Sequence, residues 1–203
     1  MIMMKKIPTT RLAITGFVLA FLMYLNSGVN AQQPDEASMR KWMEYMTPGE
    51  SHHLLASRVG KWNLSIKMWM EPGQPASEMQ ATSDIQMIMG GRYLVEKVQG
   101  EFEGAPFEGQ NTTAFDNGTK KFISTWIDNM ATGMMLAEGT YDSEKKEFHY
   151  STQFTDPMTH KPSKGRTIDR IVDESTWVMQ SFKHAPDGKE FMDMEITYRR
   201  ANQ

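Results

Sequence analysis

Apolar and polar side chains alternate along the stretch VGKWNLSIKMWM, which covers residues 59–70. From the tryptophan onward, every second residue is bulky and apolar: Trp62, Leu64, Ile66, Met68 and Met70. A period of two places successive side chains on opposite faces of a strand, so this pattern predicts a strand with one buried face. The glycine before the tryptophan, Gly60, marks the point at which the period changes.

The residues before Gly60 follow a helical period instead. Apolar residues recur there at the spacing i, i+3, i+4 and i+7, namely at Met39, Trp42, Met43 and Met46. This spacing predicts a short amphipathic helix that ends at Thr47-Pro48. A second short helix is expected over residues 50–58.

Beyond Gly60 the period of two continues to the end of the chain, interrupted by turn sequences such as Asp116-Asn117-Gly118. About ten strands are predicted, near residues 61–70, 79–89, 92–99, 107–115, 121–128, 134–140, 147–154, 165–172, 176–183 and 190–199. Consecutive strands joined by tight turns form an antiparallel meander, and closure of the meander removes its exposed edges. We therefore expect an all-β fold, an antiparallel meander β-barrel, behind one or two short N-terminal helices.

The beginning and the end of this strand series resemble those of calycin barrels, the lipocalins and fatty-acid-binding proteins. In calycins a Gly-x-Trp opens the first strand, and an arginine of the last strand covers the tryptophan. Gly60-Lys61-Trp62 and Tyr198-Arg199-Arg200 are similar to that pair. We expect Trp62 to plug the closed end of the barrel beneath Arg199 or Arg200, because a guanidinium can stack on an indole and donate to nearby carbonyls.

A closer resemblance extends over most of the chain. Blocks such as PGESHHLLASRVGKW, MGGRYLVEKVQGEFEGAPFEG, FDNGTKKFISTWIDNMATG and DGKEFMDMEITYRR are similar, in this order, to the domain-of-unknown-function 1579 family of bacterial proteins. The resemblance implies a compact barrel-like domain and brings no established activity with it. His160 stands where a family glycine is expected, so no site is assigned to the turn around it.

The first 31 residues have the pattern of a secretory signal peptide. Lys5, Lys6 and Arg11 precede an apolar run over residues 12–25, and Val29-Asn30-Ala31 offers a cleavage site of small residues. The run is shorter than the roughly 20 residues that cross a bilayer, so we expect cleavage and a periplasmic or secreted protein rather than a membrane anchor. The expected organisation is a signal peptide over residues 1–31, a leader with a short helix over 32–47, and one barrel domain over 48–203.

Charge and composition narrow the choice of partners. Residues 1–31 carry three positive and no negative charges, so their removal changes the formal net charge from −3 to −6. An acidic domain has little electrostatic attraction for nucleic acid or anionic membranes, and we expect neither as a partner. The chain has no cysteine and its histidines lack chelating spacing, so we expect no metal site. A monomer or a small homo-oligomer is expected.

Two adjacent strands of the series carry polar residues among aromatic ones. If the faces that carry them point inward, they provide a small-ligand pocket, which is mostly apolar with a few convergent polar groups. The candidate pocket residues are Asn111, Trp126, Asp128, Phe107, Phe115, Met68 and His52. The alternative is that Asn111 and Asp128 only satisfy the backbone of turns, and that His52 is a surface or capping residue.

These observations favour an exported barrel that binds a small, partly apolar molecule, and catalysis is left open. The first alternative is a barrel enzyme of hydrolase or isomerase type, with His52 and Asp128 as its acid–base pair. The second is a protein-interaction module with a filled core. No cofactor is expected, although haem held by His184 is a further alternative because some calycin-like barrels bind haem through one histidine.

Overall fold

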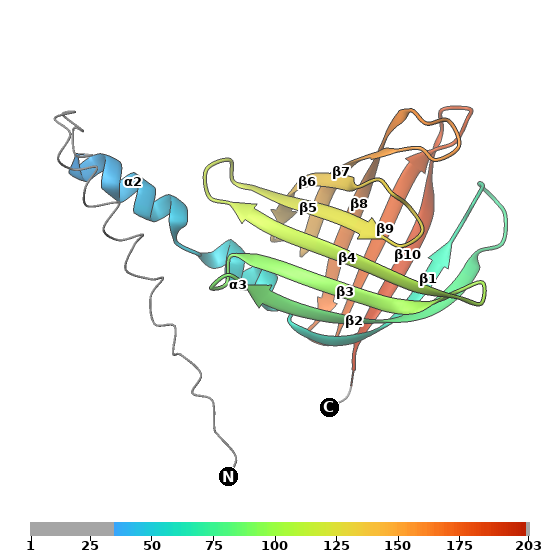
Figure 1. Cartoon of the computed structure of the whole chain (residues 1–203), viewed down its shortest axis with the longest axis horizontal. Coiled ribbons are helices and arrows are strands. Elements are labelled where there is room, and N and C mark those ends of the chain that lie inside the picture. Colours follow the sequence, from blue (N-terminus) through green and yellow to red (C-terminus); the bar gives the residue numbers. More distant parts are fainter. Residues whose placement is uncertain (1–34, 202–203) are drawn as a thin grey trace, which may run out of the picture. The chain divides into compact units, whose positions relative to one another are not determined.

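The computed structural model describes residues 35–201. The proposed signal peptide and its cleavage site lie outside the described residues. Two helices begin the described chain, α2 over Glu36–Met46 and α3 over Glu50–Ala56 (Figure 1). No helix within residues 35–201 is long and apolar enough to cross a membrane.

Ten antiparallel strands follow α3 and form one closed barrel (Figure 1). They are β1 (Gly60–Met68), β2 (Ser77–Ile88), β3 (Tyr93–Phe102), β4 (Ala105–Asp116), β5 (Lys121–Asp128), β6 (Met135–Asp142), β7 (Glu147–Thr155), β8 (Pro162–Asp173), β9 (Thr176–His184) and β10 (Glu190–Arg200). Each strand pairs with the next in the chain, and β1 pairs with β10 to close the barrel. The predicted all-β meander barrel is confirmed.

Alternation in the sequence decides which side chains point inward. In β1 the side chains of Trp62, Leu64 and Ile66 are buried, whereas the polar residues between them are exposed. The prediction that Met70 shares this buried face is wrong, because β1 ends at Met68 and the side chain of Met70 is 77% exposed.

One end of the barrel is closed by α3 and by the segment that leads into β1. Leu55 of α3 is completely buried in the core. The indole of Trp62 donates from Nε1 to the carbonyl of Arg58 over 2.9 Å, and its ring meets Trp177 and Tyr198 edge-on. This end of the barrel is therefore filled by interlocking aromatic rings.

Arg200 covers the plug in the way the calycin resemblance implies. Its guanidinium lies 4.3 Å from the Trp62 ring and donates to the carbonyls of Val59, Ser57 and Glu174. Arg199 is exposed, so Arg200 alone of the two expected arginines covers the tryptophan. Gly60 has a φ of +136°, and a Cβ there would stand 2.7 Å from Nη1 of Arg200. Glycine is favoured at this position because the positive φ strains any other residue, and its lack of a Cβ also leaves room for the guanidinium.

Candidate functional site: the barrel cavity

The barrel encloses a cavity of about 380 Å³, and every strand contributes residues to its wall. The lining residues are the inward members of each alternating strand, joined by Arg58 from the segment after α3. Met130, in the loop after β5, also lines the cavity and is 63% exposed. The cavity therefore reaches the surface near this loop, at the end of the barrel opposite α3.

One wall of the cavity is rich in methionine. Met68 of β1 lies directly opposite Met194 of β10, and Met79 and Met179 extend the row onto β2 and β9. The thioether side chain is unbranched and polarizable, so it adapts to ligands of different shape. This wall can therefore accommodate apolar groups of different shapes.

A second wall is aromatic. The rings of Phe107 on β4 and Trp126 on β5 are stacked, with centroids 6.4 Å apart and an interplanar angle of 22°. Nε1 of Trp126 donates to Oδ2 of Asp128 over 2.7 Å, and Oδ1 of Asp128 accepts from the backbone of Met130. A Cβ at Gly109 would overlap the Trp126 ring. Gly109 thus allows the indole to lie flat on β4, and Asp128 fixes its orientation.

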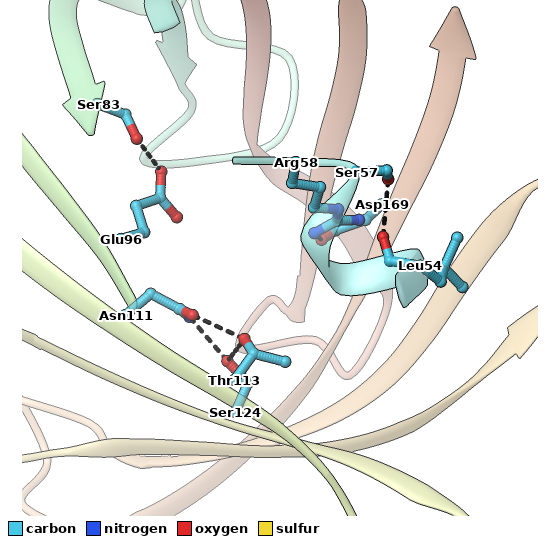
Figure 2. Close-up of polar contacts among 9 residues, drawn as sticks. All are labelled: Leu54, Ser57, Arg58, Ser83, Glu96, Asn111, Thr113, Ser124 and Asp169. Atoms are coloured by element: carbon cyan, nitrogen blue, oxygen red, sulfur yellow. Dashed lines mark hydrogen bonds and ion pairs between the residues drawn. The ribbon is translucent and has the colours of Figure 1, made fainter. Parts of the chain in front are cut away.

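A cluster of amide and hydroxyl groups lies on the same two strands as the aromatic wall, nearer α3. Asn111 donates from Nδ2 to Ser124 Oγ over 2.7 Å and accepts at Oδ1 from Thr113 Oγ1, also over 2.7 Å (Figure 2). All three side chains line the cavity. They bind one another, so their burial is satisfied within the protein and does not by itself require a ligand.

A buried ion pair stands at the closed end of the cavity. Nη1 of Arg58 donates to Oδ2 of Asp169 over 3.1 Å, and Figure 2 shows the pair beside the end of α3. The guanidinium lies 4.4 Å from the ring of Phe148 and 4.1 Å from that of Trp177. Burial raises the pKa of the Asp169 carboxyl, and the positive charge of Arg58 opposes this rise.

Glu96 of β3 is a second buried carboxyl at this depth. Its Oε1 accepts from the hydroxyl of Ser83 on β2 over 2.7 Å (Figure 2). Burial raises the pKa of Glu96, whereas the hydrogen bond from Ser83 and the charge of Arg58 lower it. The pKa of the Tyr198 phenol is also raised, first by burial and then by the nearby charges of Glu96 and Asp169. The closed end of the cavity is therefore a coupled set of ionisable groups.

Five of the seven pocket residues predicted from the sequence line the cavity: Asn111, Trp126, Asp128, Phe107 and Met68. The expectation that Asn111 only satisfies a turn is wrong, because its partners are the side chains of Thr113 and Ser124. Asp128 has both roles, since it lines the cavity and also accepts from the backbone of the following turn.

Phe115 and His52 do not line the cavity. Phe115 belongs to the inward face of β4 but packs beyond the cavity, against Phe122 at 4.8 Å and edge-on against His52 at 5.8 Å. Nδ1 of His52 accepts from the backbone N–H of Gly49 at the start of α3, and burial is the main cause of its lowered pKa. His52 is therefore a helix-capping residue, which was the alternative to a site role.

The structure does not bring His52 and Asp128 together as an acid–base pair. His52 contacts Phe115, whereas Asp128 lies opposite Gly109, six positions earlier on β4. At about 3.3 Å per residue these positions are roughly 20 Å apart along the strand. The two side chains lie toward opposite ends of the barrel.

The residues expected for haem do not fit either. His184, at the end of β9, is exposed and does not line the cavity. Within residues 35–201, no group of three or more histidine, aspartate or glutamate side chains is placed to hold a metal ion.

Sequence reasoning missed the charged groups at the closed end: Arg58, Glu96 and Asp169. A signal was present for Glu96, which stands between the inward residues Leu94 and Val98 at a position that alternation assigns to the core. Asp169 and Arg58 gave no comparable signal, because their contact joins residues 111 positions apart in the chain.

Comparisons with known proteins agree with the fold. The family model "Protein of unknown function (DUF1579)" matches residues 47–200. The crystal structure of Rv2717c from M. tuberculosis is similar with a TM-score of 0.57 and 12% identity, covering 77% of this chain and 100% of that chain. A redesigned β-barrel, b11L5F_LGL, has a TM-score of 0.38 and 13% identity over 73% of this chain and 95% of that one. No curated protein matches the sequence. At 12% identity, the likeness to Rv2717c shows the barrel fold alone.

Proposed function

The chain belongs to the DUF1579 family of proteins of unknown function, and we propose that it binds a small, partly apolar molecule inside its barrel. The observation that carries this proposal is the cavity of about 380 Å³ in a barrel that closes completely on itself. Small-molecule sites in proteins typically enclose about 300–1,000 Å³ and combine apolar walls with a few placed polar groups.

The distribution of side chains supports binding in one orientation. The methionine wall and the Phe107–Trp126 stack are apolar surfaces, and Met68 and Phe107 lie toward the open end of their strands. Arg58, Glu96 and Asp169 lie deeper, near α3, whereas the carboxyl of Asp128 stands at the open end and accepts from Trp126 and from the backbone of Met130. An amphipathic molecule would therefore enter with its polar group first and leave its apolar part between the methionine and aromatic walls.

A cavity-filling substitution tests the proposal. Ala137 of β6 lines the cavity and is buried, whereas Leu136, its neighbour on the same strand, faces outward and is half exposed. Phenylalanine at position 137 would occupy space that a ligand needs, and phenylalanine at position 136 would not. We expect the wild type and Leu136→Phe to enhance the fluorescence of Nile red, a neutral apolar probe, and Ala137→Phe to lose at least about tenfold in affinity for it.

Equal Nile red affinity in the wild type, Leu136→Phe and Ala137→Phe would place the probe outside the barrel and overturn the proposal. Thermal unfolding of each variant shows whether it is folded. Ser181→Leu fills the cavity from β9 and provides a second test if Ala137→Phe is unstable.

We further propose that the protein acts outside the cytoplasm. The support is the N-terminal pattern of three basic residues, an apolar run and a small-residue triplet. A binding protein in that location meets its ligand in the periplasm or in the medium.

A further inference from the structure

We infer that the ligand carries a protonated amine, which binds Glu96 at the closed end of the cavity. This inference rests on the proposed binding function and specifies the polar end of the ligand. The geometry behind it is the imbalance of charge among the side chains that line the cavity.

Four lining side chains carry a carboxyl or a guanidinium group: Arg58, Glu96, Asp128 and Asp169. Three of them are acids and one is a base, and Asp169 already binds the base at 3.1 Å. Glu96 and Asp128 make no salt bridge with any residue that the structure describes. The cavity therefore has an excess of acid and no free base to balance it.

Arg58 is poorly placed to receive an anionic ligand. Its guanidinium is stacked against the rings of Phe148 and Trp177. Its Nε and Nη2 atoms are buried and have no hydrogen-bond partner among the described residues, so a ligand could reach them only if the rings moved. An anionic ligand in this cavity would also lie near Glu96 and Asp128, the two acids without a salt bridge. Repulsion from their carboxylates makes an anionic ligand less favourable than a neutral or cationic one.

Glu96 is well placed to receive a donor. Its side chain is buried and lines the cavity, it accepts from the hydroxyl of Ser83 over 2.7 Å (Figure 2), and the phenol of Tyr198 is a second donor to it. A carboxylate can accept several hydrogen bonds, so acceptor capacity is left. Its pairing partner on β4 is Asn111, which places the amide–hydroxyl cluster beside it. An ammonium group has three donors, and its bond to a carboxylate is charge-assisted.

Binding of an amine should be linked to the ionisation of Glu96. The charged or titratable groups that face Glu96 are Arg58, Asp169 and Tyr198, and burial favours the neutral form of its carboxyl. A bound ammonium favours the charged form, so Glu96 releases a proton when the amine binds. The affinity for an amine should therefore rise with pH until the amine itself loses its proton, whereas that for a neutral alcohol should not.

The test compares three probes with the same chain and different ends: dodecylamine, dodecanol and dodecanoate. Each displaces Nile red from the full chain, from Glu96→Gln and from Glu138→Gln, a control for an exposed glutamate on the outer face of β6. At neutral pH we expect dodecylamine to bind best and dodecanoate worst. Glu96→Gln should lower the affinity for dodecylamine by about tenfold or more and change that for dodecanol by less than about threefold. Glu138→Gln should change neither.

The ranking of the three affinities in the wild-type protein already tests the preference for an amine, so the test does not depend on the folding of a variant. Tighter binding of dodecanoate than of dodecylamine, or an unchanged preference for the amine in Glu96→Gln, overturns the inference and leaves a binding protein of different specificity. If none of the three probes binds and Nile red is not bound either, the proposed function fails, and the inference fails with it.

Discussion

Gly109 shows how much of the cavity depends on single residues. The Trp126 ring occupies the space that a side chain at position 109 would take, and Phe107 stacks on the same ring. The indole is held at its other side by Asp128. Gly109, Phe107 and Asp128 therefore together position the indole of Trp126 as one flat apolar surface. Because Gly109 has no side chain, the sequence pattern does not indicate its role.

A methyl group at position 109 should displace the indole. We expect Gly109→Ala to lower the affinity for Nile red by about tenfold, because overpacking of this kind costs about 1–3 kcal/mol and shifts the side chains involved. Gly133→Ala is the matched control, since a Cβ there meets no atom within 4 Å. Nile red titration checks the result, and equal loss in both variants would contradict the role given to Gly109.

Glu96 should affect how stability depends on pH. Its pKa is raised in the folded protein by burial, so between its ordinary value of 4.5 and the raised value the native state binds more protons than the unfolded state. Stability from this group is therefore complete at acidic pH and is lost as pH rises through the folded pKa. Glutamine has the shape of the neutral acid and does not ionise.

We accordingly expect Glu96→Gln to gain stability relative to the wild type as pH rises from about 4 to about 8. Urea unfolding at several pH values measures the difference in the free energy of unfolding. The exposed Glu138→Gln should show no such trend. A difference between Glu96→Gln and wild type that stays constant with pH would show that folding does not raise the pKa of Glu96.

At the scale of elements, the strands were predictable and their ends were less so. Alternation located all ten strands, because an inward apolar face is required at each of them. The first strand was expected to extend to Met70, but β1 ends at Met68. The alternation of apolar and polar residues continues beyond the end of the strand into the following turn, where Met70 is exposed.

The positions of residues along a strand decided which site predictions succeeded. Asn111 and Trp126 line the cavity together, as expected from the alternation, because the short turn over residues 117–120 sets them opposite each other on β4 and β5. Phe115 belongs to the same face, but the depth at which α3 enters the barrel decides that it lies outside the cavity, and no local pattern encodes that depth. Contacts between distant elements, such as Arg58 with Asp169, were likewise not predictable.

The plug that joins β1 to β10 should contribute much of the stability of the closed end. Trp62 is buried against Trp177, Tyr198 and Arg200. We expect Trp62→Ala to lower the free energy of unfolding by about 3–5 kcal/mol, as for other buried large aromatic residues. Trp42→Ala removes a tryptophan that is 56% exposed and should change it by less than about 0.5 kcal/mol. Similar unfolding midpoints for the two variants in urea would contradict the plug.

For the whole molecule, we propose that the protein is exported and binds its ligand outside the cytoplasm. The N-terminal pattern predicts that processing removes residues 1–31 and leaves Gln32 as the first residue. Intact-mass measurement of protein collected from the periplasm or the medium checks this. A chain that keeps these residues, or that is found in the cytoplasm alone, would contradict export without affecting the barrel.

The proposed function requires that the barrel hold one small molecule in its cavity. Native mass spectrometry of the protein after incubation with Nile red, the neutral apolar probe, counts the bound molecules on each intact chain. We expect one bound molecule per chain for the wild type and for Leu136→Phe, and a much smaller bound fraction for Ala137→Phe at the same probe concentration. A bare chain in all three proteins, or the same adduct in all three, would contradict it.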